Sequence, residues 1–140
     1  MTYLLDSNIC IYFLKGSFPF LRQRLLSHRP AEIAIPSLVK AELLYGAYKS
    51  ERSTQNEQAV TQFLLPYSVL PFGDLEVIHY AQIRATLESA GTPIGPNDMI
   101  IAAIARANEG VLVTHNTSEF GRVPDLNVED WTHDHEDRAT

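Results

Sequence analysis

Three acidic residues, Asp6, Glu42 and Asp98, stand beside apolar segments where their carboxylates could share a metal ion. Asp6 directly follows the apolar run 3–5, which has the character of a buried strand. Asp98 lies in the first turn of a predicted helix that is otherwise almost wholly apolar. It could complement the helix dipole, which would be worth about 0.3–1 kcal/mol, or cap the helix, but neither role requires an acid beside a buried helix. Glu42 has apolar neighbours on another predicted helix, and taken alone it could equally face solvent.

Such a group of acids favours one kind of chemistry. Carboxylates that are brought together repel one another and resist ionisation, and a divalent cation relieves that repulsion. Hard oxygen ligands with few or no imidazoles favour Mg²⁺ or Mn²⁺. One or two such ions could orient a water molecule, lower its pKa and stabilise the charge on a phosphodiester during in-line attack. This chemistry needs no nucleophilic side chain.

Other catalytic and metal-binding patterns find little support in the sequence. His115 and Ser118 are close in sequence but form no convincing triad. The five histidines show no zinc-type spacing with the single cysteine. His133 and His135 are predicted to face solvent, and no glycine-rich phosphate-binding loop is present.

Short apolar strands alternate with helical stretches along the chain and must position these acids. Strands are predicted at residues 3–5, 33–35, 68–70, 111–113 and, as a more polar edge strand, 126–131. The first helix is predicted to run from a cap at Ser7 or Asn8 to Lys15, where Gly16 ends it. The alternation implies an α/β/α sandwich around a mainly parallel central sheet. Ligands of such sheets bind beyond the carboxyl ends of the strands.

A polar loop at residues 114–120 follows the predicted strand 111–113 and should reach the same sheet edge. Its Asn116 could ligate a metal through the side-chain carbonyl or hold a water molecule. Glu119 could supply a fourth carboxylate. The competing interpretation is an ordinary polar loop in which asparagine and serine serve turn roles.

The composition is that of a globular protein. With 140 residues, of which 45% are hydrophobic, the chain fits one domain with a sizeable core. We place this domain at residues 1–131 and a polar, disordered tail at 132–140. No apolar run approaches the ~20 residues needed to cross a bilayer, and the start of the chain lacks a signal-peptide pattern. A cytoplasmic location is therefore expected, and the lone Cys10 is expected in the core.

The net charge of −6 alone argues against a broad nucleic-acid-binding surface. The charges are unevenly distributed, however. Residues 125–140 hold six acids against one arginine, whereas residues 1–124 hold eleven acids and ten bases. If three of those eleven acids bind a metal, the remaining surface is slightly basic. A polyanionic substrate is therefore permitted, although the charge does not demand one.

Four segments together resemble the PIN-domain ribonucleases, and within them the VapC toxins of bacterial and archaeal toxin–antitoxin pairs. They occur in the order typical of that family and span almost the whole chain: residues 3–9, 41–46, 93–103 and 112–120. The segment around Asp98 is the most specific of the four. A lone aspartate after a strand would be weak support, but four linked segments are strong.

The resemblance implies a Mg²⁺- or Mn²⁺-dependent endoribonuclease that cleaves RNA, often tRNA or another structured RNA. It implies Asp6 and Asp98 as the main metal ligands, with Glu42 completing the site directly or through water. It also implies a homodimer and a small VapB-like antitoxin whose C-terminal segment lies over the active site.

The sequence departs from the family pattern at one position. Many PIN domains carry a fourth acid soon after the last core strand, where this chain has Asn116, and Glu119 is the candidate replacement. Ser7 stands where the family commonly has threonine or serine. Its hydroxyl could bond to a carboxylate or to a phosphate.

Two alternatives remain at this point. A phosphatase of the haloacid-dehalogenase kind also begins with an aspartate after its first strand, but it usually needs a second aspartate where this chain has Asn8. A PIN-fold module could instead bind RNA or a protein without cleaving. The presence of Asp6, Glu42 and Asp98 together speaks against that second alternative.

Overall fold

Five strands form the centre of the protein, in a computed structural model that describes residues 1–133 of the chain. The strands are β1 (Tyr3–Leu5), β2 (Ile33–Pro36), β3 (Ser68–Leu70), β4 (Val111–Val113) and β5 (Asn127–Glu129). They lie in the order β3-β2-β1-β4-β5, and every neighbouring pair is parallel. The predicted α/β architecture with a parallel central sheet is confirmed.

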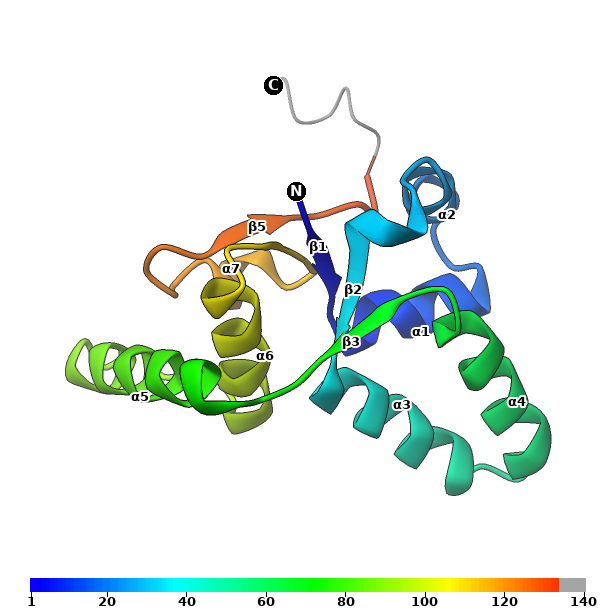
Figure 1. Ribbon diagram of the computed structural model, residues 1–140, viewed down its shortest axis with the longest axis horizontal. Helices are drawn as coiled ribbons and strands as arrows, with labels where there is room; N and C mark the ends of the chain where they lie inside the picture. The colour runs from blue at the N-terminus through cyan, green and yellow to red at the C-terminus, as the bar shows by residue number, and fades with distance from the viewer. Residues whose placement is uncertain (134–140) are drawn as a thin grey trace.

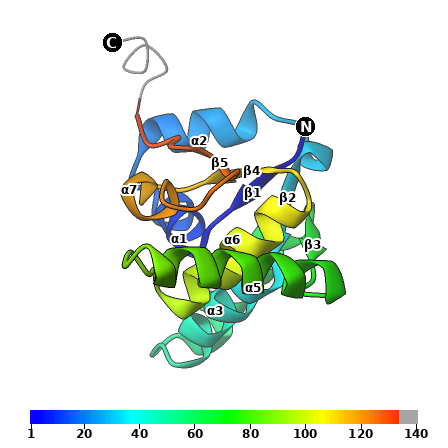
Figure 2. The same ribbon diagram turned by 90° about the vertical axis from the view of Figure 1, so that its left-hand side faces the viewer.

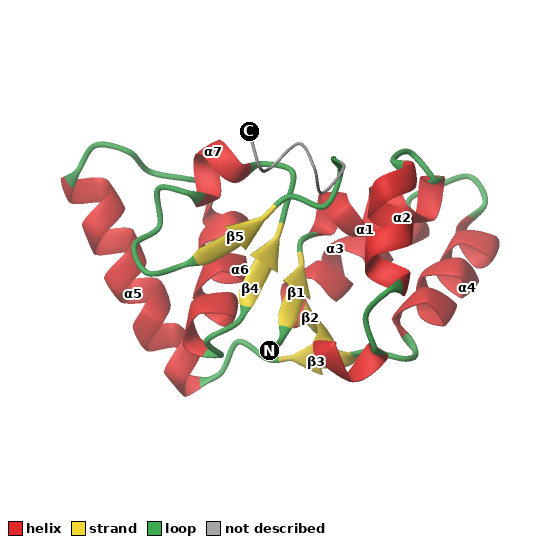
Figure 3. Cartoon of the chain, turned by 90° about the horizontal axis from the view of Figure 1, so that it is seen from above, coloured by secondary structure: helices red, strands yellow, loops and turns green. Residues whose placement is uncertain are grey.

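Helices flank this sheet on both sides. They are α1 (Ser7–Lys15), α2 (Pro19–Leu26), α3 (Ser37–Tyr48), α4 (Ser53–Leu64), α5 (Asp74–Ser89), α6 (Pro96–Ala107) and α7 (Thr117–Phe120), with a short 3-10 helix at Pro30–Glu32. Helices α5 and α6 group at one side of the molecule, and α1, α2 and α4 at the other (Figures 1 and 3). Figure 2 shows α5 as the outermost element, lying across α6. Within residues 1–133, none of the helices combines the length and apolar character needed to span a membrane.

The core lies between the sheet and these helices. Leu4, Leu5 and Leu112 are completely buried, and burying a leucine side chain contributes roughly 1.5–3 kcal/mol. Helix α6 is buried along most of its length, as its apolar sequence predicts. Gly110 joins α6 to β4 at a tight crossing, because a Cβ there would collide with the side chain of Leu4. Cys10 is buried, as expected.

Helix α1 begins with a cap that the sequence analysis assigned wrongly. Its N-cap is Asp6, whose Oδ1 accepts a hydrogen bond from the backbone N–H of Ile9 at 2.9 Å. Ser7 is the first helical residue, and Asn8 is exposed. An aspartate at the cap satisfies an otherwise unpaired helix donor. The same side chain is therefore fixed in place by α1.

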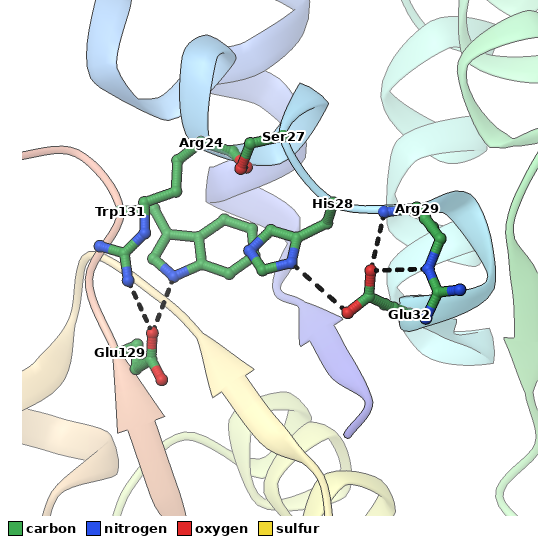
Figure 4. Close-up of polar contacts among 7 residues, drawn as sticks. All are labelled: Arg24, Ser27, His28, Arg29, Glu32, Glu129 and Trp131. Atoms are coloured by element: carbon green, nitrogen blue, oxygen red, sulfur yellow. Dashed lines mark hydrogen bonds and ion pairs between the residues drawn. The ribbon is translucent and has the colours of Figure 1, made fainter.

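A cluster of side chains, here called the α2–β5 clamp (Arg24, His28, Glu129 and Trp131), holds β5 against α2 (Figure 4). Arg24 Nη2 and Trp131 Nε1 both donate to Oε1 of Glu129, at 3.1 Å and 3.0 Å. The fully buried indole stacks on His28 with ring centroids 4.8 Å apart. The arginine also lies 5.4 Å from the centre of the Trp131 ring. The clamp thereby fixes the end of the chain's last strand.

The folded chain continues past the predicted domain end at residue 131. Thr132 was assigned to the tail, but it is only 4% exposed, and its backbone N–H and hydroxyl both bond to Oδ1 of Asp130. His133 follows it with an exposed side chain. The rest of the predicted tail, residues 134–140, lies outside the described residues.

Candidate active site

The register of the sheet brings polar residues from three strands to one edge. The last residues of β1, β4 and β5 are aligned across the parallel pairs. The residues that follow them, Asp6, Thr114 and Asp130, therefore lie next to one another at the carboxyl edge of the sheet. The backbone N–H of Asp6 bonds to the carbonyl of Val113 at 3.2 Å, and that of Thr114 to the carbonyl of Glu129 at 2.9 Å. This is the edge where ligands of parallel sheets bind.

Asp6 is the most enclosed carboxylate at this edge, with 5% of its surface exposed. Its pKa is raised to about 6, mainly by burial and to a lesser extent by the negative charges of Glu42 and Asp130. Hydrogen bonds from Thr114 and from the backbone of Ile9 act in the opposite direction without cancelling it. Burial disfavours the charged form because the carboxylate loses its hydration. Asp6 is thus held in position, but its negative charge is only poorly compensated by its surroundings.

Glu42 reaches the same edge from α3. Its Oε1 accepts a hydrogen bond of 2.8 Å from the hydroxyl of Ser7. Ser7 is the first residue of α1, so this bond links the beginning of α1 to the middle of α3. Glu42 also lines an open pocket of about 370 Å³ between α1, α3 and α4, whose walls include Ile11, Leu14, Gly46 and Val60. The side chain of Glu42 therefore lies between the other acids of this sheet edge and a largely apolar groove.

Asp98 extends into the cluster from the first turn of α6. Its pKa is raised to about 6, mainly by partial burial and in addition by the charges of Glu119, Asp6 and Glu42. Asp98 therefore lies within electrostatic reach of Asp6 and Glu42, the other two acids of the predicted metal site. A capping role does not account for Asp98, since the N-cap of α6 is Gly95 and has no side chain.

The loop after β4 contributes two further residues. Oε1 of Glu119 accepts a bond of 3.1 Å from the backbone N–H of Gly95, and its Oε2 accepts one from the side-chain amide of Asn116. Glu119 also lies close enough to Asp98 to raise the pKa of that carboxyl. Glu119 therefore stands beside Asp98 as the fourth carboxylate. Asn116 acts as a donor that orients Glu119.

These four carboxylates, Asp6, Glu42, Asp98 and Glu119, are called the carboxylate cluster below. Among residues 1–133, no lysine, arginine or histidine forms an ion pair with any of them. Two carboxylates of the cluster have raised pKa values, which is the electrostatic situation that a bound divalent cation relieves. An all-oxygen donor set of this kind fits Mg²⁺ or Mn²⁺.

Two residues at this edge, Thr114 and Asp130, were not predicted from the sequence. Thr114 is fully buried, and its side chain bonds to Asp6 and to the backbone N–H of Asn116. Asp130 acts on Asp6 through its charge. Thr114 could have been found, because it directly follows the predicted strand 111–113. Asp130 could not, because its place depends on the pairing of β5 with β4.

Comparison with known proteins identifies the family. The PIN domain family model matches residues 3–126. Ribonuclease VapC2 of Rickettsia felis is 39% identical over 132 residues, which cover 94% of this chain and 98% of that protein. The chain belongs to the VapC ribonucleases of the PIN-domain family. Another VapC relative, the tRNA(fMet)-specific endonuclease VapC of Salmonella typhimurium, is 37% identical over 131 residues, with 94% and 98% of the two chains covered.

A solved VapC structure also has this fold. The crystal structure of VapBC2 from Rickettsia felis bound to a DNA fragment from their promoter contains a chain that matches with a TM-score of 0.88 and 37% identity. The match covers 94% of this chain and 99% of that one. The resemblance to VapC toxins drawn from the four sequence segments is thus confirmed at the level of family and fold.

Proposed function

We propose that the chain is a metal-dependent endoribonuclease, with the carboxylate cluster as its active site, and that it serves as the toxin of a toxin–antitoxin pair. The observation that carries this proposal is the convergence of four carboxylates that have no basic partner among the described residues. Its membership of the VapC ribonucleases supports the choice of RNA as substrate.

Asp6, Glu42 and Asp98 are the proposed ligands of Mg²⁺ or Mn²⁺, and Glu119 and Asn116 are auxiliary residues. When bound, such an ion supplies an activated water molecule and stabilises negative charge on the phosphodiester. The chain's own contribution is to fix the ligands. Asp6 is held by Ile9 and Thr114, and Glu42 by Ser7. Such prior positioning lowers the cost of ordering the site during reaction.

A structured RNA is the proposed substrate class. One relative is named a tRNA(fMet)-specific endonuclease, so tRNA is the first candidate. The cytoplasm is the proposed location because these substrates are found there. The end mapping described below gives the cleavage position.

The proposed protein partners are a VapB-like antitoxin and a second copy of the chain. The solved Rickettsia neighbour is a VapBC2 assembly, and the apolar groove beside Glu42 offers a docking place for an antitoxin segment that would then cover the active site. The exposed Leu75, Val77 and Ile78 on α5 support a homodimer, since apolar patches mark interfaces. Substitution of Leu14→Glu in the groove should weaken inhibition by added antitoxin.

The direct test is cleavage of total RNA by the purified protein with Mg²⁺, with Mn²⁺ and with EDTA. Discrete cuts that disappear with EDTA are expected, and mapping their ends gives the substrate. Asp98→Asn should fold and lose cleavage. Asp74→Asn is the matched control, because Asp74 is also in the first turn of its helix but is exposed and remote from the cluster.

Two results would contradict the proposal. One is cleavage that persists undiminished in EDTA. The other is a wild-type protein that is as inert as Asp98→Asn on total RNA and on tRNA with either metal. In the second case a non-cleaving RNA- or protein-binding module becomes the better account.

A further inference from the structure

A second group of potential metal ligands lies outside the carboxylate cluster and has a different chemical character. His115, in the loop after β4, and Asp130 and His133, after β5, each offer one ligand atom, and these atoms all lie within 4.8 Å of one another. His115 Nδ1 is 3.0 Å from Asp130 Oδ2, and His133 Nε2 is 3.6 Å from the same oxygen. Two ligands of a tetrahedral ion at 2.0–2.1 Å are separated by about 3.3 Å. The observed spacing therefore suits one shared ion.

The orientation of Asp130 is fixed by its neighbour Thr132. The backbone N–H of Thr132 donates to Oδ1 at 2.9 Å, and its hydroxyl donates to the same oxygen at 2.6 Å. This arrangement turns Oδ2 toward the two imidazoles. Partial burial pulls the pKa of Asp130 upward, but the bonds from Thr132 and His115 outweigh it and hold the pKa below its usual range. Asp130 is therefore a carboxylate at neutral pH.

His115 is also held in place. Its ring packs against Tyr12 and Phe18, with centroid separations of 6.0 Å and 5.5 Å. Its Nδ1 lies 3.0 Å from the hydroxyl oxygen of Thr132, and the single proton of that hydroxyl is donated to Oδ1 of Asp130. Ligands oriented by outer-shell hydrogen bonds are characteristic of metal sites. His133 is 57% exposed, so an ion can enter from solvent.

We propose that His115, Asp130 and His133 bind a zinc-class divalent cation, with water as the fourth ligand. Two imidazoles and a carboxylate with an open position form a donor set typical of Zn²⁺. The ion would fasten the segment after β5 to the loop after β4, which carries Asn116 and Glu119. The site shares no ligand with the carboxylate cluster, so the proposal of a bound ion here does not rest on the proposed nuclease activity.

The test is titration of the tag-free full-length protein with ZnCl₂, followed by calorimetry, in excess Mg²⁺ to saturate the carboxylate cluster. One Zn²⁺ per chain is expected. His115→Gln and His133→Gln should each weaken Zn²⁺ binding by about tenfold or more, and Thr132→Val by about tenfold through loss of the outer contact. His79→Gln, a histidine on α5, is the matched control and should bind as wild type does. Asp98→Asn should also bind as wild type does.

A second measurement separates the two sites and guards against misfolding. Co²⁺ in the His115 site should show the strong visible absorption of tetrahedral coordination, which octahedral carboxylate–water coordination lacks. Each variant is first checked for a wild-type circular dichroism spectrum. The proposal fails if wild type binds no Zn²⁺ under these conditions, if both histidine variants bind as wild type does, or if binding is lost in Asp98→Asn but kept in the histidine variants.

Discussion

Glu129 of the α2–β5 clamp and the carboxylate cluster both lie near the carboxyl edge of the sheet, but they differ in whether a basic side chain accompanies them. Glu129 in the α2–β5 clamp receives an arginine and an indole N–H on one oxygen. Asp6 and Asp98 in the carboxylate cluster have no basic partner among residues 1–133, and the pKa of each is raised to about 6. The chain thus supplies its own cation where a carboxylate holds strand β5 against helix α2. It supplies none where we propose catalysis.

This difference separates a structural role from a functional one. A paired carboxylate that anchors β5 should matter for stability and little for chemistry. A cluster of unpaired, partly buried carboxylates costs stability and is retained for what it can bind. Substitutions in the two groups should therefore have opposite consequences, and the following predictions are ordered from the largest expected effect to the smallest.

Asp6→Asn should abolish most of the RNA cleavage without unfolding the protein. The amide oxygen of asparagine can still cap α1 by accepting from Ile9, but the ligand charge is lost. Loss of a metal ligand should lower kcat/KM by at least about 100-fold. Glu129→Gln, in the clamp, is the comparison and should keep most activity per folded molecule. If Asp6→Asn cleaved RNA at a rate within a few-fold of wild type, Asp6 would not be part of the active site.

The stability of the metal-free protein should depend on pH through the same acids. The pKa of Asp6 rises from 3.8 to about 6 on folding, so the folded state binds the proton more tightly than the unfolded state. Stability is therefore lost as pH rises from about 4 to about 6, by roughly 2–3 kcal/mol for Asp6. The contribution of Asp98 is smaller because it is half-exposed and screened.

Urea unfolding at pH 5 and pH 7.5, with and without Mg²⁺, measures this effect. Mg²⁺ should restore stability at pH 7.5 and do little at pH 5, and Asp6→Asn should flatten the pH dependence relative to wild type. If the wild type and Asp6→Asn had parallel pH profiles, burial of the Asp6 charge would not be the cause.

Arg24→Met should reduce stability and spare the chemistry. Methionine keeps an apolar stem beside Trp131 but removes the ion pair between Arg24 and Glu129. Loss of a partly buried charged hydrogen bond should lower the free energy of unfolding by roughly 1–3 kcal/mol. Arg84→Met removes an exposed ion pair with Glu88 and should change the free energy of unfolding by less than about 1 kcal/mol. Equal stability of the two variants would argue against the clamp.

Ser7→Ala should have a much smaller effect on activity than Asp6→Asn. It removes the 2.8 Å bond to Glu42 but no ligand charge, and a hydrogen bond worth about 0.5–1.5 kcal/mol corresponds to a loss of roughly 2- to 13-fold in kcat/KM. Ser7→Thr keeps the hydroxyl and should remain close to wild type. A loss as large as that of Asp6→Asn would instead place Ser7 in direct contact with the substrate.

The sequence was informative where short segments carry the structure. An apolar strand followed by Asp6, and an apolar helix opened by Asp98, are local patterns that predict the sheet edge and two acids on it. The sequence left undecided whether Glu119 lies beside Asp98, because this depends on how the loop after β4 turns toward α6. The clamp and the position of Asp130 were missed. Both need the parallel pairing of β5 with β4, which joins residues that no local pattern relates.

The most direct test of the central claim is Mn²⁺ binding, measured from the electron paramagnetic resonance signal of free Mn²⁺. Wild type should bind Mn²⁺ that added Mg²⁺ displaces. Asp98→Asn should bind it at least about tenfold more weakly, because one ligand charge is lost, and Glu129→Gln should bind it as wild type does. Equal Mn²⁺ affinity of the wild type and Asp98→Asn would contradict the account, because the carboxylate cluster would then not be the metal site.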